Sequence, residues 1–393
     1  MKIGIIGCGY VASFYARNAR NYSDLEIVAA YDEDSEILEK FCRCYGIKPH
    51  STLENFLSDG SIEFVLNLTN PRSHFEITRV CLTAGKHVYS EKPIALNLDE
   101  AQVLIDLAKS LQLRLGCAPC GVLSNTAQTV WSALKNLEIG SVKLVYANYD
   151  DGMIAPNMKP WNWTTDHGAH WPAKDEFEIG CTYEHAGYFL TWLNLFFGPA
   201  LAISAYSSCQ ISDKGIAVKK MAPDFSTGCI EYEHGVVARV TCGLVAPEDK
   251  SLTIIGDKGH LIVKHLRNDN EQVYIKKEDP GKNVRRVENF MNKWVYRNYL
   301  FDKIAPWPRT EFSFYEKYPM LQKESRNNAT KIKKVDFMLG VKDMVVAIQN
   351  NKPHRLSGEF GLHILEQIEV LQYPERFNFR KKINSGFPLN TFT

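Results

Sequence analysis

The chain has 393 residues, which is enough for two domains with substantial hydrophobic cores. Its 46 Lys and Arg residues nearly balance its 45 Asp and Glu residues, and the net charge of +1 argues against a general nucleic-acid binder, which needs a basic excess. No apolar run approaches the roughly 18 uninterrupted residues that a membrane span requires. The chain opens on a predicted strand without the pattern of a signal peptide, so we expect a cytoplasmic protein with no nucleic-acid or membrane partner.

The ten cysteines do not follow the spacing of a metal site or of a disulfide framework. Cys42 and Cys44 form one close pair, and Cys117 and Cys120 form another, but no second C-x-x-C completes a zinc quartet. We therefore expect no metal and mostly buried, reduced thiols. A redox role for Cys117 and Cys120 is the less favoured alternative, because the surrounding thioredoxin-like pattern is missing.

The first 120 residues alternate short apolar runs with stretches of helical periodicity. They predict strands at residues 2–6, 25–31, 62–69, 88–90 and 113–116, and helices at residues 11–21, 37–45, 73–84 and 97–111. Ser73 with Glu76 predicts a capping box, and Asn97 with Glu100 predicts a second helix start. This alternation predicts an α/β Rossmann domain over residues 1–120, with a doubly wound parallel sheet and right-handed crossovers.

The pattern changes after Gly121. Helices are predicted at residues 124–137 and 183–196, and strands at residues 142–149, 201–207, 227–232, 236–241, 252–255 and 260–264. Consecutive strands joined by tight turns predict a large, mainly antiparallel sheet, in an α+β substrate-binding domain over residues 121–393. Residues 266–335 are polar and weakly periodic, and we interpret them as an insertion or extended arm.

The segment from Gly7 to Ala12, Gly7-Cys8-Gly9-Tyr10-Val11-Ala12, has the form G-x-G-x-x-A between a predicted strand and a predicted helix. In such a turn the first glycine permits the tight bend, the second lets a pyrophosphate approach the backbone, and the helix N-terminus attracts the anion. Asp32 ends the next predicted strand, where a carboxylate binds ribose hydroxyls and repels a 2′-phosphate. We therefore predict NAD as the cofactor, with NADP less favoured. The alternative is a glycine turn that binds nothing.

Glu91-Lys92-Pro93 follows the strand at residues 88–90 and therefore lies at the carboxyl edge of the sheet, where open α/β folds bind ligands. A lysine at that edge can polarise a substrate hydroxyl or lower the pKa of a neighbouring group. Taken alone, the same residues favour an exposed Lys-Pro loop.

Together, these segments resemble the Gfo/Idh/MocA family of oxidoreductases over most of the chain. The resemblance rests on the glycine turn, on Thr69-Asn70-Pro71-Arg72-Ser73-His74, on Glu91-Lys92-Pro93, on the helix from Gly180 to Gly198 and on Arg355-Leu356-Ser357-Gly358-Glu359. It implies that Lys92 lies beside the nicotinamide and the substrate hydroxyl. It further implies that the cofactor is lined by Thr69, Asn70, Pro71, His74 and Glu91.

The second catalytic element of that family is usually Asp-x-Gly-x-His on a helix, and this sequence departs from it. Counting back from Gly198, the Asp position falls on Glu184 and the His position on Tyr188, while His185 is a competing candidate. Some relatives carry Tyr where others carry His, so the resemblance implies that Tyr188 and Lys92 form the acid/base pair. We expect the Lys92 cation to lower the pKa of Tyr188. The alternative is that Tyr188 is only a packed helical aromatic.

We predict that the substrate-binding residues include Lys92, Glu184 and Tyr188. Further candidates from an aromatic segment are Trp161, Trp163, His167, His170, Trp171, Lys174 and Asp175, whose indole faces and polar groups suit a sugar. A loop packed by its own aromatics is the alternative. A hypothesis with less support assigns the diphosphate of a nucleotide-linked sugar to the basic residues Lys282, Arg285, Arg286, Lys293 and Arg297.

The predicted function is hydride transfer to or from a secondary alcohol or ketone of a sugar, polyol or nucleotide-linked sugar. Two alternatives are an NAD-retaining enzyme with no net redox change, such as an epimerase or an enzyme that cleaves glycosides by transient oxidation, and a non-enzymatic dinucleotide-binding sensor or partner subunit. The resemblance also implies a homodimer or homotetramer that assembles through an open-faced sheet of the second domain.

Overall fold

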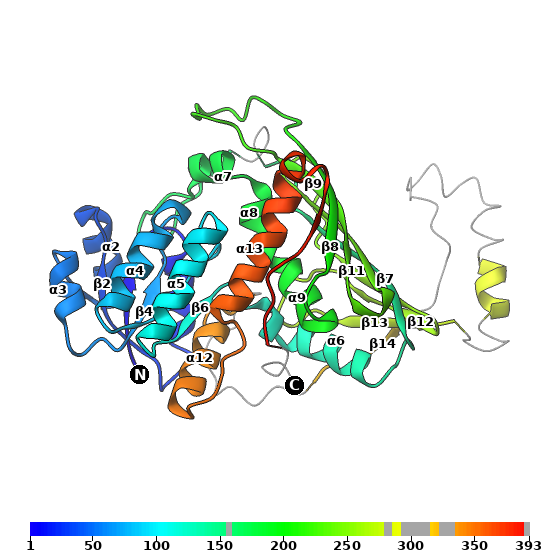
Figure 1. Ribbon diagram of the computed structural model, residues 1–393, viewed down its shortest axis with the longest axis horizontal. Helices are drawn as coiled ribbons and strands as arrows, with labels where there is room; N and C mark the ends of the chain where they lie inside the picture. The colour runs from blue at the N-terminus through cyan, green and yellow to red at the C-terminus, as the bar shows by residue number, and fades with distance from the viewer. Residues whose placement is uncertain (155–158, 279–284, 292–314, 322–334, 389–393) are drawn as a thin grey trace.

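A computed structural model describes residues 1–154, 159–278, 285–291, 315–321 and 335–388. The described chain forms two lobes, each built on one sheet (Figure 1). The N-terminal elements surround the smaller sheet, and the strands that follow residue 141 form the larger one. The predicted combination of a Rossmann domain with a mainly antiparallel second sheet is confirmed.

The smaller sheet has six strands in the order β3-β2-β1-β4-β5-β6, and each neighbouring pair is parallel. This is the Rossmann strand order, whose direction reverses next to β1. The strands are β1 (Lys2–Ile6), β2 (Glu26–Tyr31), β3 (Lys48–Pro49), β4 (Phe64–Asn67), β5 (His87–Ser90) and β6 (Leu115–Cys117). Only β3 was not predicted, because two residues are too short to produce a periodic signal.

The helices of this lobe are α1 (Ala12–Ala19), α2 (Ser35–Tyr45), α3 (Leu53–Ser58), the 3₁₀ turn η1 (Pro71–Ser73), α4 (His74–Thr83) and α5 (Leu98–Ser110). Asn97 caps α5 as predicted, since its side chain accepts the Glu100 N–H at 2.9 Å. The capping box predicted at Ser73 is wrong. Ser73 already has helical dihedral angles because η1 precedes α4, and its hydroxyl instead donates to Asn70 at 3.4 Å.

The larger sheet has nine strands in the order β14-β13-β12-β11-β7-β10-β9-β8-β15. All neighbouring pairs are antiparallel except β7 and β10, which are parallel. The strands are β7 (Val142–Asp150), β8 (Ala202–Ser208), β9 (Phe225–Glu231), β10 (Val237–Gly243), β11 (Leu252–Gly256), β12 (Gly259–Val263), β13 (Val273–Lys277), β14 (Glu316–Lys317) and β15 (Arg380–Lys382). Both β13 and β14 lie within residues 266–335, so part of the stretch that we interpreted as an arm extends this sheet.

The helices of the second part of the chain lie mainly between the two sheets (Figure 1). They include α6 (Asn125–Lys135), α7 (Ala173–Ile179), α8 (Cys181–His185), α9 (Gly187–Phe197), α12 (Leu339–Gln349) and α13 (Gly358–Gln372), with 3₁₀ turns at Gly121–Leu123, Pro160–Asn162, Glu233–Gly235 and Pro374–Phe377. Helix α13 packs against β8 and α5, and therefore bridges the two lobes. The domain division at residue 120 stays a prediction.

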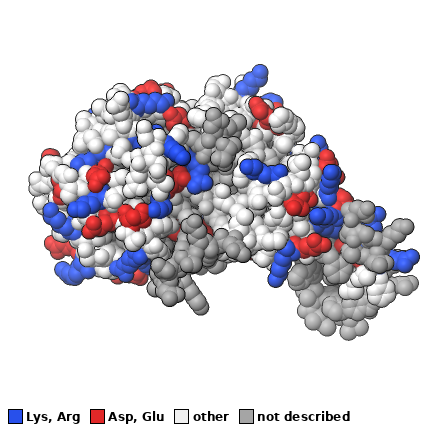
Figure 2. All heavy atoms as spheres, turned by 90° about the horizontal axis from the view of Figure 1, so that it is seen from below, with Lys and Arg blue, Asp and Glu red and all other residues white. Residues whose placement is uncertain are grey.

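The surface charge and the helices of the structure are consistent with the nearly balanced charges and the lack of long apolar runs in the sequence. On the face shown in Figure 2, basic and acidic side chains are intermixed. None of the described helices combines the length and the apolarity needed to cross a membrane. All ten cysteines are free thiols, and seven of them are buried, as predicted.

Candidate active site

The glycine turn between β1 and α1 has two glycines with different surroundings. Gly7 has φ of +92°, and a Cβ there would lie 2.6 Å from the backbone of Leu68 and Thr69, so no other residue fits without a backbone shift. A Cβ at Gly9 would meet no atom within 4 Å, because Gly9 faces an open cleft. Gly7 is therefore required for the bend of the turn. Gly9 leaves its backbone accessible from the cleft, which suits close approach of a pyrophosphate.

Asp32 closes this turn from the end of β2. Its carboxylate accepts the Cys8 N–H at 2.6 Å and the Asp34 N–H at 2.9 Å, and it lines the cleft together with Glu33. The bare glycine backbone, the start of α1 and this acidic pair fit a dinucleotide with an unphosphorylated ribose. Gly7, Gly9 and Asp32 are cofactor residues predicted from the sequence, and Glu33 is an addition from the structure.

The cleft has a volume of about 740 Å³ and runs from the glycine turn to residues of the second lobe. The predicted cofactor residues that line it are Gly7, Gly9, Tyr10, Val11, Asp32, Thr69, Asn70, Pro71, His74, Glu91 and Lys92. The predicted catalytic and substrate residues that line it are Lys92, Trp163, His170, Trp171, Asp175, Glu184, His185 and Tyr188. Cys8 faces away from it and is buried. Trp161, which packs beside Gly215, and the exposed Lys174 also lie outside its lining.

The aromatic loop before α7 is attached to the Rossmann lobe by His167. The His167 Nε2 lies 2.8 Å from the Cys8 carbonyl oxygen, and its ring packs edge-on against Phe41 at 5.2 Å. Burial lowers the pKa of His167, so the ring is a neutral structural contact. Trp163 and Trp171 contact each other at 5.7 Å and also line the cleft. The loop thus packs by its own aromatics and still presents two indoles to the cleft.

Lys92 forms an ion pair with Glu184 across the boundary between the lobes. Its backbone N–H donates to Glu91 at 3.0 Å, and Glu91 in turn accepts the Tyr15 hydroxyl at 2.7 Å. Burial disfavours the Lys92 charge, but the neighbouring acids, above all Glu184, hold its pKa above the usual value for lysine. Lys92 is therefore a cation at neutral pH.

Glu184 and Tyr188 lie on two consecutive helices rather than on the single predicted helix. Ala186 separates α8 from α9 but keeps helical dihedral angles of −62° and −28°, so both side chains still reach the same cleft. Burial raises the pKa of the Tyr188 hydroxyl, while the cations Arg267 and Lys92 act in the opposite direction. The effect of Lys92 on this pKa has the predicted sign, but burial outweighs it.

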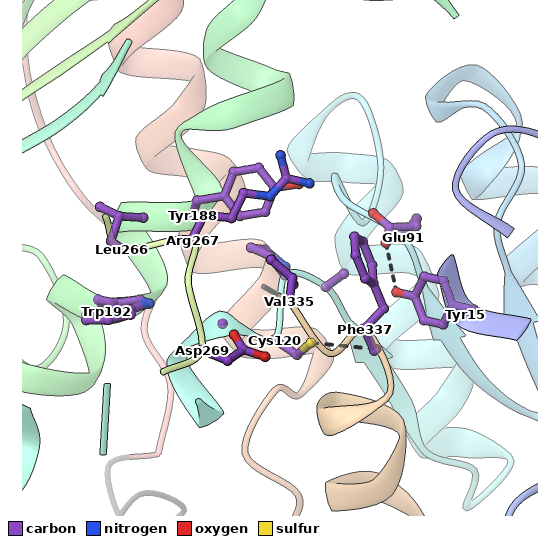
Figure 3. A pocket seen from close by; sticks show the side chains of 13 residues that line it. Tyr15, Glu91, Cys120, Tyr188, Trp192, Leu266, Arg267, Asp269, Val335 and Phe337 are labelled. Atoms are coloured by element: carbon purple, nitrogen blue, oxygen red, sulfur yellow. Dashed lines mark hydrogen bonds between the residues drawn. The ribbon is translucent and has the colours of Figure 1, made fainter. Parts of the chain in front are cut away.

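Arg267 is a residue of this cleft that the sequence analysis missed. Its guanidinium lies 4.5 Å from the centroid of the Tyr188 ring (Figure 3). It also donates to the Tyr149 hydroxyl at 3.1 Å. The Tyr149 ring in turn stacks on Tyr188 at 5.1 Å. A single arginine at the start of a polar, weakly periodic stretch carries no sequence signal that would have identified it.

His185 faces two acids, Glu176 and Asp151, which are also cleft residues that the sequence analysis did not identify. Its Nε2 lies 3.4 Å from Glu176 Oε1 and 3.9 Å from Asp151 Oδ2. Burial lowers the pKa of His185 to about 4 and raises the pKa of Glu176 well above its usual value. His185 is therefore uncharged at neutral pH, burial favours the protonated form of Glu176, and Asp151 is paired with Lys250.

The remaining candidate groups lie away from the cleft. Cys117 and Cys120 are buried, and burial raises the pKa of both thiols, so neither is a thiolate at neutral pH. Cys120 lines a separate pocket of about 20 Å³ behind Tyr188 (Figure 3). Among the described residues, no three His, Cys, Asp or Glu side chains are grouped to hold a metal. Lys282, Lys293 and Arg297 fall outside the described residues, whereas Arg285 and Arg286 are exposed and do not line the cleft.

Known proteins that resemble the chain in sequence, and solved structures that resemble it in fold, include the following three. An uncharacterized oxidoreductase of Synechocystis is 23% identical over 284 residues, which are 70% of this chain and 74% of that protein. Glucose-6-phosphate 3-dehydrogenase of Bacillus subtilis is 28% identical over 167 residues, 42% of this chain and slightly less than half (46%) of that enzyme. The WlbA dehydrogenase of Bordetella pertussis, solved with NADH and UDP-GlcNAcA, superposes with a TM-score of 0.69 over 98% of both chains at 19% identity.

Family assignment rests on both parts of the chain. Residues 1–118 match the oxidoreductase family with an NAD-binding Rossmann fold, GFO_IDH_MocA. Residues 127–262 match the GFO/IDH/MocA C-terminal domain. The matched segments contain the glycine turn, Lys92, Glu184 and Tyr188. The chain therefore belongs to the Gfo/Idh/MocA family of NAD-binding oxidoreductases.

Proposed function

We propose that this protein is an NAD-dependent dehydrogenase or reductase that acts on a secondary alcohol or ketone of a sugar, a polyol or a nucleotide-linked sugar. The observation that carries the proposal is the continuous cleft, which extends from the glycine turn and Asp32 to Lys92 and Tyr188. The nicotinamide, when bound, supplies the group that accepts or donates hydride.

The acid/base work falls to Lys92 and Tyr188. Tyr188 accepts the proton of the substrate hydroxyl in oxidation and returns it in reduction, while the Lys92 ammonium donates a hydrogen bond to the same oxygen. Glu184 holds the Lys92 side chain through their ion pair. We assign Glu91 to the nicotinamide ribose and Asn70 to the lining of the cofactor site.

The walls of the second lobe suit a polyhydroxylated substrate. Trp163 and Trp171 offer apolar faces to a sugar ring, and Asp175 and Glu176 offer oxygen atoms to hydroxyl groups. The names of two similar proteins support this class, since one oxidises glucose 6-phosphate and the other was solved with a UDP-linked sugar acid. Asp32 and Glu33 favour NAD over NADP, because the acids repel a 2′-phosphate.

The proposal is tested by following NADH formation and consumption with a panel of sugars, polyols and nucleotide sugars. For a substrate that turns over, Lys92→Met and Tyr188→Phe should each lower kcat by about 10²- to 10⁴-fold, because each removes a group that acts on the reacting proton. NADH binding, followed by fluorescence, should survive in Tyr188→Phe. Lys342→Met is the matched control, since Lys342 is paired with Asp24 on the surface away from the cleft. Full activity of both cleft variants would contradict the proposal.

A second candidate, turnover without net redox change, is favoured by the contact between Glu176 and the uncharged His185 in the same cleft, 3.4 Å apart. A reaction that removes a proton from the carbon beside a transient ketone needs such a second acid/base group. The two candidates differ in solvent-hydrogen exchange. Incorporation of solvent deuterium into substrate carbon without NADH accumulation supports the second, and stoichiometric NADH formation supports the first.

A further inference from the structure

We propose that Arg267 is a positioning residue that stabilises the deprotonated side chain of Tyr188 and so prepares it to accept the substrate proton. This inference rests on the role of Tyr188 in the proposed function. It assigns the activation of Tyr188 mainly to a residue of the second lobe, rather than to Lys92 alone.

The Arg267 guanidinium lies in direct contact with the Tyr188 ring. The guanidinium carbon lies over the Tyr188 ring at 4.5 Å from its centroid, and Figure 3 shows the two side chains extending side by side. A cation in this position is attracted to the ring face of a neutral phenol. It attracts a phenolate more strongly, because the phenolate carries a full negative charge.

The backbone on both sides of Arg267 is held in place. The Leu266 N–H donates to the Lys250 carbonyl at 2.8 Å, and the Thr126 hydroxyl donates to the Asn268 carbonyl at 2.9 Å. The side chain is held by its hydrogen bond to the hydroxyl of Tyr149, whose ring stacks on Tyr188. The cation is thus oriented before any substrate arrives, as electrostatic preorganisation requires.

Arg267 differs from the cations near it, Lys92 in the cleft and Lys250 outside its lining, in how its charge is compensated. Lys92 is paired with Glu184, and Lys250 is paired with Asp151. Among the described residues, no carboxylate lies within ion-pair distance of Arg267, and Asp151, the acid that acts on it electrostatically, is itself paired with Lys250. Accordingly, Arg267 opposes the burial of Tyr188 more strongly than Lys92 does in setting the Tyr188 pKa.

The groups that face Tyr188 come from several elements. They are Arg267 beyond β12, Lys92 and Glu91 beyond β5, Glu184 and His185 on α8, and Tyr149 on β7. Glu91 and Glu184 favour the neutral phenol, whereas the two cations favour the phenolate. Removing Arg267 leaves Lys92 as the single cation of this set, and it is already paired.

The test is a titration that does not depend on turnover. Difluorotyrosine, whose phenol ionises at lower pH than tyrosine, replaces the 18 tyrosines, and the ¹⁹F resonance of residue 188 is assigned by its loss in Tyr188→Phe. Arg267→Met should shift the ionisation of residue 188 upward by about 1 to 3 pH units, the usual effect of losing one adjacent opposite charge. Arg267→Lys should restore part of the shift.

Arg239→Met is the matched control, because Arg239 lies over the Tyr146 ring at 4.2 Å on the exposed part of the larger sheet. It should leave the ionisation of residue 188 unchanged. An equal ionisation pH in wild type and Arg267→Met, or a wild-type residue 188 that stays neutral until the protein unfolds, would overturn the inference.

Kinetics then tests the link to the proposed function. With any substrate that turns over, Arg267→Met should move the acidic limb of the kcat/KM profile to higher pH, in the same direction as the titration. A shifted titration combined with an unshifted profile keeps the electrostatic inference and removes Tyr188 as the base. Failure of the proposed function is thereby distinguished from failure of the inference.

Discussion

Gly7 and Gly9 stand in the same turn, but a side chain would meet different surroundings at the two positions. Gly7 has a positive φ and its Cβ would clash with the backbone of Leu68 and Thr69, whereas a Cβ at Gly9 would enter the cleft. Gly7→Ala should therefore lower the free energy of unfolding by about 2 kcal/mol, since the left-handed conformation alone costs roughly 1–2 kcal/mol. Chemical denaturation measures this loss.

Gly9→Ala is the matched comparison in that experiment. Its free energy of unfolding should stay within about 0.5 kcal/mol of wild type, because the added methyl group meets open space. Its NADH affinity should fall by about tenfold or more, equivalent to about 1.4 kcal/mol, because the methyl group keeps the pyrophosphate from the backbone. Unchanged NADH binding would show that the cofactor does not approach this turn.

At the scale of elements, the two helices that carry the acid/base candidates show how a local pattern survives a local break. Glu184 and Tyr188 were expected on one face of a single helix. The structure divides that helix at Ala186 but leaves the residue helical, so the spacing of four residues still brings both side chains to the cleft. The functional prediction therefore depends on the helical repeat and not on the continuity of the hydrogen-bond ladder.

Helix α5 offers a direct test of capping. Asn97 adopts extended dihedral angles and accepts the Glu100 N–H, which has no partner within the helix. Asn97→Ala should lower the free energy of unfolding by about 1 kcal/mol, and Asn97→Ser should preserve it to within a few tenths, because serine caps about as well. Equal losses in the two variants, measured by urea denaturation, would place the effect outside the cap.

For the whole molecule, the C-terminal part of the chain returns to the Rossmann lobe. Met338, Val341, Met344 and Val345, at the start of α12 and along it, are buried in the same cluster as Ile3 of β1. The Cys117 N–H also donates to the Leu356 carbonyl at 3.1 Å, so the edge of the first sheet is completed by residues far along the sequence. The C-terminal segment therefore stabilises the Rossmann lobe and connects it to the rest of the chain that forms the cleft.

Stability should fall with acidification through buried histidines. His363 on α13 is fully buried and its Nε2 accepts the Ala200 N–H at 3.0 Å, and burial lowers its pKa from 6.5 to about 4 despite the opposing charge of Glu366. Because the unfolded chain binds the proton first, this contribution is complete above pH 6.5 and is lost as the pH falls toward 4. The slope is at most about 1.4 kcal/mol per pH unit for one group.

The measurement is urea denaturation from pH 7 to pH 4 in wild type and His363→Gln. The variant should lose part of the pH dependence, and His185, whose pKa is also about 4, should supply part of the remainder with the same sign. His234→Gln, at an exposed position, should retain the wild-type slope. A variant at His363 with an unchanged slope would contradict the assignment.

The oligomeric state of the protein remains a prediction. The expected homodimer or homotetramer would cover the outer face of the larger sheet, where Leu144 is 40% exposed and Tyr206 is 53% exposed. Exposed apolar side chains on a sheet are a reason to expect a covering partner.

Residue types and their spacing were enough to predict the features that depend on short-range chemistry. The strand, glycine turn and helix at the N-terminus, the acid that ends β2 and the lysine after β5 follow from residue types at fixed local spacing, and the helical repeat identified Glu184 and Tyr188. These signals predicted most of the fold. They also predicted the cleft residues of the Rossmann lobe, because a parallel sheet brings its strand ends to one edge.

The surroundings of those residues became apparent only from the folded chain. Arg267, Glu176 and Asp151 reach the cleft from segments without any shared pattern, and His167 attaches its loop to a carbonyl group more than 150 residues earlier in the chain. Burial also reversed the expected net shift of the Tyr188 pKa, since desolvation depends on atoms brought together by folding. Local spacing predicts where a side chain begins, whereas its partners and its solvation are properties of the folded chain.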